Sequence, residues 1–232
     1  MNAVEAAGVW KFYGDFPALR EVSFRAEAGS CLALLGRNGA GKTTLLRIVA
    51  GLARAGRGQV RILGGDPRER ATRLRVGVLG HGISLYDELS ARENLEWFAR
   101  LYGLGDAPAR ARLWLERTGL ERMCDARVRE FSRGMRQRLA VARVFLHDPA
   151  VLLLDEPFTA LDDRAIALLQ GLLREGLARG RTVVLSTHQL REALELATHV
   201  ALLVRGRLAH AGERTVRMLD DPGWLYRQYG EA

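Results

Sequence analysis

Long apolar runs are the first feature that this sequence lacks, although hydrophobic residues make up 48% of its 232 residues. Its longest runs have about five residues, as in Val200–Val204, whereas a membrane-spanning helix needs about 20. We therefore expect that the chain does not cross a membrane. The first ten residues, MNAVEAAGVW, have no basic start and no long apolar stretch, so we expect no secretory signal and a cytoplasmic protein.

Cysteine is scarce as well, with only Cys31 and Cys124 in the chain. Cys31 lies in the apolar run CLALLG and is expected in the core, whereas Cys124 lies in a polar segment. Their separation does not match the spacing of metal ligands, and a cytoplasmic chain needs no disulfide. The sequence thus excludes a disulfide scaffold and a zinc-ribbon type of protein.

Lysine is the scarcest charged residue, because 33 of the 35 basic residues are arginine and only Lys11 and Lys42 are lysine. The net charge of +8 could attract nucleic acid or anionic lipid headgroups. However, the arginines are spread between acidic residues, and even the densest cluster, Arg68–Arg75, is not a tail of like charges. We therefore expect arginines on solvated faces and no nucleic-acid partner.

The spacing of apolar residues changes twice along the chain. Short β-like runs alternate with turns up to about position 80, helical spacing follows, and strands and helices alternate again after Asp148–Pro149. The expected strands are Val22–Phe24, Cys31–Leu35, Gln59–Leu63, Val76–Leu79, Val151–Leu154, Thr182–Ser186 and Val200–Val204. The expected helices are Lys42–Leu52, two within Ser90–Leu120, Asp163–Ala178 and Gln189–Thr198.

These patterns predict one α/β domain over residues 1–232, because the last strands are apolar throughout, as in a parallel sheet buried on both faces. We expect a nucleotide-binding core in 1–81 and 138–213, a helical subdomain in 82–137 and a tail in 214–232. The tail carries Trp224, Tyr226 and Tyr229, which we expect to pack on the core rather than to serve a site.

A phosphate-binding loop follows the strand CLALL and opens a helix, which is the context that the pattern G-x-x-x-x-G-K-[ST] requires. It consists of Gly36, Arg37, Asn38, Gly39, Ala40, Gly41, Lys42 and Thr43, followed by Thr44. The glycines allow backbone N–H groups to surround phosphate oxygens, and the helix start adds positive partial charge. Lys42 is expected to reach the β- and γ-phosphates, and the Thr43 hydroxyl to bind Mg²⁺.

Two carboxylates, Asp155 and Glu156, follow the buried strand Val151–Leu154. Asp155 is expected to help hold Mg²⁺, and Glu156 to orient or deprotonate the attacking water. The alternative, ordinary carboxylates at the end of a strand, is disfavoured by the phosphate-binding loop upstream. His188 ends the run TVVLSTH, where an imidazole could contact the γ-phosphate, although a single histidine there is often structural.

A second helix start, Ser132-Arg-Gly134, carries a hydroxyl and a glycine that could hold an anion against free N–H groups. A simple helix-capping serine is the alternative. Because one phosphate cradle already exists in the chain, this helix start is expected to close over the nucleotide of another copy.

In this order, the motifs resemble those of the ATP-binding subunit of ABC transporters over essentially the whole chain. The matches are Gly36–Thr44 to the Walker A loop, Val151–Glu156 to Walker B, Ser132–Met135 to the signature, Leu161–Asp162 to the D-loop, His188 to the switch histidine and Tyr13 to the aromatic residue that stacks on adenine. The resemblance implies that Tyr13, Thr44, Ser132, Gly134 and Asp162 contact nucleotide.

The resemblance also implies a fold and partners. It implies a P-loop ATPase core with a mixed sheet, an N-terminal antiparallel β subdomain and an inserted helical subdomain. The implied cofactors are ATP and Mg²⁺, and the implied partners are a second copy in a head-to-tail homodimer and an integral membrane permease. Such a subunit lies at the cytoplasmic face of the membrane, and Trp97, Phe98 and Tyr102 are expected either in its groove for the permease or in the subdomain core.

Two departures from the family pattern narrow the resemblance. The signature reads FSRGM instead of LSGGQ, so the contacts of Arg133 and Met135 are not predicted. His81 stands where the family has glutamine and is expected near the nucleotide, where a protonated imidazole would repel Mg²⁺. Activity is therefore expected to change with pH, and the profile of His81→Gln between about pH 6 and 8 tests this.

Within the family, LGH at His81, the helix ARENLEWFARLYGL, FSRGMRQRL and the chain length resemble the haem-exporter ATPase of cytochrome c maturation. The alternative is the ATPase of a drug, polysaccharide or lipid exporter, many of which have a longer C-terminal extension. A non-transport ABC protein is disfavoured, because Thr44 to Phe131 leaves no room for a coiled-coil insertion. A regulatory module without turnover is disfavoured by Lys42 and Glu156.

Overall fold

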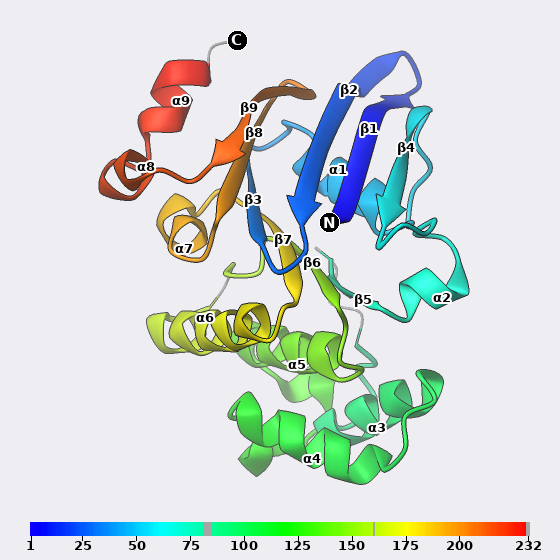
Figure 1. Ribbon diagram of the computed structural model, residues 1–232. Coiled ribbons are helices and arrows are strands. Elements are labelled where there is room, and N and C mark those ends of the chain that lie inside the picture. Colours follow the sequence, from blue (N-terminus) through cyan, green and yellow to red (C-terminus); the bar gives the residue numbers. More distant parts are fainter. Residues whose placement is uncertain (81–84, 160, 231–232) are drawn as a thin grey trace.

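The computed structural model describes residues 1–80, 85–159 and 161–230. Within them, the chain forms two β-sheets and a set of helices that cover the larger sheet (Figure 1). The smaller sheet, drawn mostly in blue and cyan, comes almost entirely from the N-terminal part of the chain. The larger sheet draws its strands from the middle and the C-terminal part as well as from one early strand.

The smaller sheet is antiparallel, with the order β2-β1-β4. Its strands are β1 (Asn2–Tyr13), β2 (Phe16–Glu27) and β4 (Arg57–Ile62). Gly14–Asp15 joins β1 to β2 as a two-residue hairpin turn, and Gly14 takes the left-handed φ of 57° that such turns favour. The turn sets Tyr13 directly opposite Phe16 across the two strands.

The larger, central sheet has the order β5-β6-β7-β3-β8-β9 and is mixed. Its first five strands are parallel and β9 is antiparallel to β8. The strands are β3 (Cys31–Leu35), β5 (Val76–Leu79), β6 (Val151–Asp155), β7 (Thr182–Thr187), β8 (His199–Val204) and β9 (Arg207–Glu213). Because β3, β6 and β7 are parallel neighbours, their carboxyl ends meet at one edge of the sheet.

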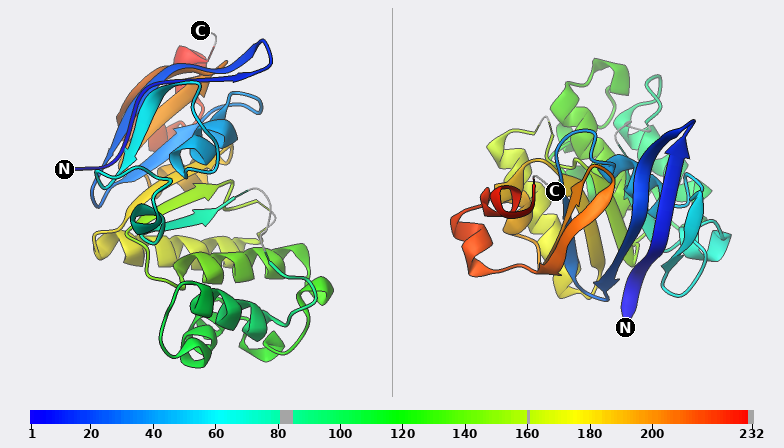
Figure 2. Two further views of the ribbon diagram at one scale, coloured as in Figure 1. Left: turned by 90° about the vertical axis from the view of Figure 1, so that its right-hand side faces the viewer. Right: turned by 90° about the horizontal axis from the view of Figure 1, so that it is seen from above.

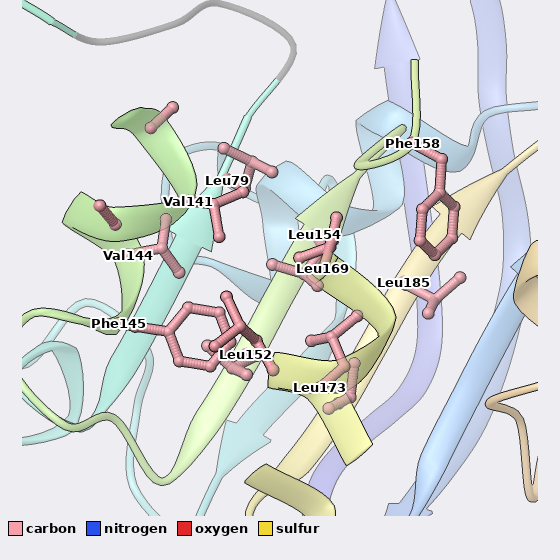
Figure 3. Close-up of a cluster of buried hydrophobic side chains, with 14 of the residues drawn as sticks. Leu79, Val141, Val144, Phe145, Leu152, Leu154, Phe158, Leu169, Leu173 and Leu185 are labelled. Carbon is pink, nitrogen blue, oxygen red and sulfur yellow. The ribbon is translucent and has the colours of Figure 1, made fainter. Parts of the chain in front are cut away.

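Residues along each central strand alternate between two hydrophobic cores, as the two-residue period of a strand requires. In β6, Leu152 and Leu154 face the core beneath helices α5 (Arg133–Phe145) and α6 (Asp163–Ala178), whose Phe145 and Leu173 pack against them (Figure 3). Val151 and Leu153 face a second core, which the central sheet shares with helix α1 (Lys42–Val49) and the smaller sheet. A strand buried on both faces explains why its sequence is apolar throughout.

Helices connect the strands and cover both faces of the central sheet. The α-helices are α1 (Lys42–Val49), α2 (Arg70–Arg73), α3 (Ala91–Leu101), α4 (Ala107–Arg117), α5 (Arg133–Phe145), α6 (Asp163–Ala178), α7 (Leu190–Leu194), α8 (Val216–Asp220) and α9 (Trp224–Tyr229). Two 3-10 turns, Glu121–Met123 and Val128–Glu130, precede α5. No helix in the described ranges is long and apolar enough to cross a bilayer.

The helices α3 and α4 lie beyond the layer of α5 and α6, on the side away from the smaller sheet (Figure 2). A capping box starts α3: the Ser90 hydroxyl accepts the Glu93 N–H, and the Glu93 carboxylate accepts the Ser90 N–H. The predicted limit of the helical subdomain at residue 137 falls inside α5, so the division of the chain into subdomains stays a prediction.

The structure differs from the expected elements in several places, among them three short helices, α2, α8 and α9, that the sequence does not predict. The strand β1 is not predicted, β9 is not predicted, and α7 ends at Leu194 instead of Thr198. The tail aromatics pack on the core as expected, because Trp224, Tyr226 and Tyr229 contact the cluster beneath α5 and α6.

Candidate functional site

The loop Gly36–Gly41 leads from the end of β3 to the start of α1. Gly41 has a φ of 106°, and a Cβ there would lie only 2.8 Å from the Ala18 oxygen and from Leu19 Cδ2. A residue with a side chain would therefore be strained and would collide with β2. Glycine also brings no side-chain cap, so the first N–H groups of α1 are left to other acceptors.

Lys42 is the first residue of α1 and is buried, with 6% of its surface exposed. Its ammonium donates a hydrogen bond of 2.7 Å to the Gly36 oxygen and lies 3.7 Å from Oε1 of Glu156. A buried ammonium needs such partners. A phosphate group could replace them, because its oxygens accept the same hydrogen bonds and carry negative charge.

Glu156 directly follows β6 and lies between Lys42 and His188. Its φ of 51° is left-handed, which is uncommon for a residue with a side chain and recurs at functional sites. Its N–H donates to the Ser186 oxygen (2.8 Å), which fixes the backbone at this turn. Its Oε2 accepts the His188 N–H (3.3 Å) and lies 2.9 Å from His188 Nδ1.

Asp155, the last residue of β6, is 6% exposed and accepts a hydrogen bond from the Ser186 hydroxyl. Together with Thr43 it lines a hollow of about 310 Å³ beside the phosphate loop. A carboxylate and a hydroxyl are oxygen ligands of the kind that Mg²⁺ prefers, with water and phosphate oxygens completing its shell. The residues present therefore fit a Mg²⁺ ion.

An open pocket of about 500 Å³ brings most of the predicted residues together. It is lined by Tyr13, Phe16, Ala18, Arg37, Asn38, Gly39, Ala40, Gly41, Lys42, Thr43, Thr44 and Glu156. Tyr13 is 53% exposed, and the Lys11 ammonium lies 5.3 Å from the centre of its ring. The pocket thus has an aromatic end on the hairpin and a cationic end at Lys42.

Six of the predicted site residues that the structure describes do not line this pocket. Gly36 and Asp155 adjoin lining residues in the chain, and His188 contacts Glu156. The other three belong to the starts of two other helices. Ser132 is exposed and caps α5 by accepting the Met135 N–H. Gly134 lies in the first turn of the same helix. Asp162 caps α6 by accepting the Ala165 N–H at 2.8 Å. His81 lies outside the described residues.

Sequence reasoning misses two residues at or near the site. Phe16 lines the pocket because the hairpin pairs it with Tyr13, a signal present in the string YGDF. Ser186 binds Asp155 because the two residues are paired in the register of β6 and β7. The available signal in the sequence is a polar residue inside an otherwise apolar strand.

The ABC transporter family matches residues 19–159 of the chain. A second, shorter match, to residues 125–194, is described as AAA domain, putative AbiEii toxin, Type IV TA system. The chain is 41% identical to Nod factor export ATP-binding protein I of Rhizobium meliloti over 88% of its own length. It spans only 62% of the length of that protein.

Two further relatives have higher coverage. The Nod factor export ATP-binding protein I of Paraburkholderia xenovorans is 40% identical, with 95% of this chain and 74% of that protein covered. The daunorubicin resistance ATP-binding protein DrrA3 of Streptomyces coeruleorubidus is 42% identical, with 91% of this chain and 68% of that protein covered.

Solved structures match the fold. One, titled "Structure of ATP binding subunit of ABC transporter", superposes with a TM-score of 0.86 at 32% identity and covers 98% of this chain and 93% of its own. Another, a dimeric post-hydrolysis state of the ATP-binding cassette MJ0796 bound to ADP and Pi, gives a TM-score of 0.82 at 26% identity. It covers 91% of this chain and 99% of its own.

Proposed function

Since the chain belongs to the ABC transporter family and has the fold of its ATPases, we propose that it is the ATP-hydrolysing subunit of an exporter. The observation that carries the proposal is the contact between a phosphate-loop lysine and a candidate general base. Lys42 lies 3.7 Å from Glu156, and Glu156 lies 2.9 Å from His188. These are the groups that phosphoryl transfer to water requires.

ATP binds in the 500 Å³ pocket, with its phosphates against the loop and its base near Tyr13. Lys42 exchanges the Gly36 oxygen for β- and γ-phosphate oxygens, and the N–H groups of Gly39–Thr44 surround them. Tyr13 and Phe16 offer aromatic surface to the adenine ring. Because Tyr13 is 53% exposed, its ring has surface available for stacking.

Thr43 and Asp155 would hold Mg²⁺ through their hydroxyl and carboxylate oxygens. When bound, the ion neutralises charge that develops on the phosphate oxygens. The Ser186 hydroxyl occupies one oxygen of Asp155, which fixes the orientation of the carboxylate.

Glu156 orients the attacking water and accepts its proton. Its turn after β6 and its contact with the His188 N–H limit the positions that the carboxylate can take. His188 has half of its side chain exposed and lies on the γ-phosphate side, where it can bind that group and respond to its loss. Lys42 and His188 thus flank the base.

A second copy completes the site, with Ser132 and Gly134 contacting the nucleotide of the first copy and Asp162 at the interface. The proposal is supported by the exposure of Ser132 and Asp162 and by the dimeric structure of MJ0796. Because Ser132 already caps its own helix, this helix start is stable on the surface of a single copy.

A membrane permease binds at the groove between α3, α5 and β5. Phe98 and Tyr102 line this groove, which has a volume of about 560 Å³. Their position supports the expectation that these two residues belong to the permease groove, and not the alternative that they belong to the subdomain core. Trp97 is 44% exposed and is not among the lining residues of the described chain. The groove is also lined by Arg143 and by arginines near α2, so it favours an acidic partner segment.

The exporter class is drawn from the relatives, whose names refer to Nod factor export and daunorubicin resistance. These names favour the drug or polysaccharide class of exporter over the haem exporter, which is supported by the sequence features LGH at His81, ARENLEWFARLYGL and FSRGMRQRL. The length of the chain carries no argument here, because it spans part of a longer relative.

A mixed-dimer experiment tests the composite site. Two differently tagged copies, one with Lys42→Ala and one with Ser132→Arg, are co-expressed, and the mixed dimer is isolated by tandem affinity purification. In a head-to-tail dimer, both changes fall in one site and the other site is intact. We expect both homodimeric variants to lose MgATP hydrolysis and the mixed dimer to recover it.

The outcome that contradicts the composite site is a mixed dimer no more active than either variant alone. If the wild-type chain fails to hydrolyse MgATP both alone and with its permease, the proposed ATPase function itself is wrong.

A further inference from the structure

The helix α5 carries one buried polar side chain, Gln137, to which none of the motifs assigns a role. It lies in the second turn of the helix and is 8% exposed, and Leu139 and Ala140 after it are fully buried. Its side-chain amide donates a hydrogen bond of 3.1 Å to the backbone oxygen of Pro157. A buried amide needs such a partner, because it has lost its hydrogen bonds to water.

The acceptor belongs to the turn that presents the candidate general base. Pro157 directly follows Glu156, whose φ of 51° is left-handed. A proline favours an extended conformation in the residue before it, so the conformation of Glu156 departs from that preference and is also uncommon in itself. Backbone of this kind persists only where its surroundings fix it. The contacts of the turn therefore decide where the Glu156 carboxylate lies.

The turn is held from three sides. The Ser186 oxygen on β7 accepts the Glu156 N–H at 2.8 Å. Phe158 is fully buried in the core beneath α5 and α6 (Figure 3). The third contact is the hydrogen bond from Gln137, and it acts on the carbonyl of Pro157, because a proline has no N–H through which it could be held.

The position of this turn matters for the carboxylate that it presents. Glu156 lies 3.7 Å from the Lys42 ammonium and 2.9 Å from His188 Nδ1. A general base acts only within about 2.6 to 3.2 Å of the group whose proton it takes, so a displacement of about 1 Å moves it out of reach. Gln137 is not among the residues that line the 500 Å³ pocket, so any effect on the reaction passes through the turn.

We propose that Gln137 is a positioning residue for hydrolysis, which holds the Pro157 carbonyl and thereby keeps the Glu156 carboxylate between Lys42 and His188. The inference rests on the proposed function of the same site. Each copy of the chain positions its own base in this way. Loss of a neutral hydrogen bond of this kind corresponds to about a fivefold change in rate.

Three variants test the role of the amide. Gln137→Met keeps the length of the side chain and removes the donor, whereas Gln137→Asn keeps an amide that is one methylene shorter. Gln170→Met is the matched control, because Gln170 of α6 is 7% exposed and donates to the Glu192 oxygen at 3.2 Å, away from the turn after β6. Steady-state MgATP hydrolysis and thermal melting are measured for each, using the full chain and its permease where turnover needs it.

We expect Gln137→Met and Gln137→Asn to lower kcat at least about fivefold and to change KM less than about twofold, because the phosphate loop and Tyr13 carry the binding of the nucleotide. Gln170→Met should melt at a temperature similar to that of Gln137→Met and keep the wild-type kcat. A purely structural role for Gln137 would not produce this difference between two buried amides.

The mixed dimer of Lys42→Ala and Ser132→Arg copies shows through which end of α5 the change acts. Its active site uses Glu156 of the Ser132→Arg copy and Ser132 of the Lys42→Ala copy. Adding Gln137→Met to the Ser132→Arg copy should therefore lower the rate at least about fivefold, whereas adding it to the Lys42→Ala copy should leave the rate unchanged.

Unchanged kcat in both Gln137 variants overturns the inference, and so do equal losses in Gln137→Met and Gln170→Met. The reverse pattern in the mixed dimer also overturns it, because the change would then act through Ser132. A mixed dimer that is inactive before Gln137 is changed contradicts the composite site instead, and kcat of the homodimeric variants then decides. A wild-type chain without turnover would remove the proposed function, and the inference with it.

Discussion

Two helices begin at places where the sequence predicts anion binding, and in the structure the two helix starts differ in burial and in capping. The start of α1 has glycine at its cap, and Lys42 there is buried and contacts Glu156. The start of α5 is exposed, and Ser132 caps it from within. The first is prepared for an anion inside the chain, whereas the second is complete by itself and faces outward.

The carboxyl end of α5 contrasts with its exposed start. The carboxyl end of α5 is buried: Phe145 is in the core, and the following His147 stacks on Tyr102 with ring centres 4.0 Å apart. Along the helix, Gln137 donates to the Pro157 oxygen at 3.1 Å, one residue after Glu156. The helix α5 therefore contacts the turn that carries the candidate base.

The largest expected effect is on hydrolysis itself and comes from Glu156, which belongs to neither helix start. Glu156→Gln keeps the size of the side chain and removes the base, so we expect hydrolysis to fall by about 10²- to 10⁴-fold while MgATP still binds. The variant should accumulate as an ATP-bound dimer in size-exclusion chromatography. Hydrolysis near the wild-type rate would remove Glu156 from its role and leave the contact with Lys42 unexplained.

The second effect acts on the buried end of α5. Burial lowers the pKa of His147 from 6.5 to about 4, with Arg143 and Arg181 adding to the decrease and the Val76 carbonyl and Asp148 opposing it. The unfolded chain therefore binds this proton at a higher pH than the folded chain does. Stability contributed by neutral His147 is complete above about pH 6.5 and is lost as pH falls towards 4.

We expect the unfolding free energy to fall by about 2 to 3 kcal/mol over this range, as measured by urea denaturation. His147→Phe keeps a ring beside Tyr102 and removes the titrating group, so its stability should vary less with pH. The same slope in both proteins would show that other groups cause it.

The third effect tests the need for glycine at the start of α1. Gly41→Ala should weaken MgATP binding about tenfold or more, because its Cβ meets β2 and its φ is unfavourable for alanine. Fluorescence titration with an ATP analogue measures this. Gly171→Ala in α6, where no atom lies within 4 Å of the added Cβ, is the matched control and should not weaken binding.

The smallest effect concerns the cap of α5. Ser132→Ala removes the hydrogen bond to Met135 N–H and should lower the unfolding free energy of the chain by about 1 kcal/mol. Thr215→Ala is the control, because Thr215 precedes α8 without a side-chain cap. Equal losses in the two variants would show that the Ser132 contact contributes nothing specific.

The sequence predicts those strands and loops whose pattern is set by residues that are neighbours in the chain. The apolar strands β3, β6 and β7 are recognisable because both of their faces are buried, and the loop Gly36–Thr44 has its required strand and helix on either side. In contrast, β1 is hidden in NAVEAAGVWKFY, where alanine and glycine weaken the strand pattern. Its partners β2 and β4 stabilise it through tertiary pairing.

The contacts between distant segments are the part that the sequence does not predict. Ser186 binds Asp155 through the register of two strands, and Gln137 of α5 binds the Pro157 oxygen beside Glu156. The motifs indicate Asp155 and Glu156 but contain no information on what packs against them. The narrow resemblance to a haem exporter likewise depended on a few deviant residues, and the relatives carry other names.

The scarcity of lysine has a practical consequence for reagents that react with amines. Lys42 lies at the phosphate end of the pocket, and Lys11 lies beside Tyr13 at its aromatic end, where its ammonium also donates to the Arg54 oxygen. Both ε-amino groups of the chain are thus beside the same pocket. Acylation of lysine, read by mass spectrometry, would report on the occupancy of this pocket with almost no background from the remaining surface.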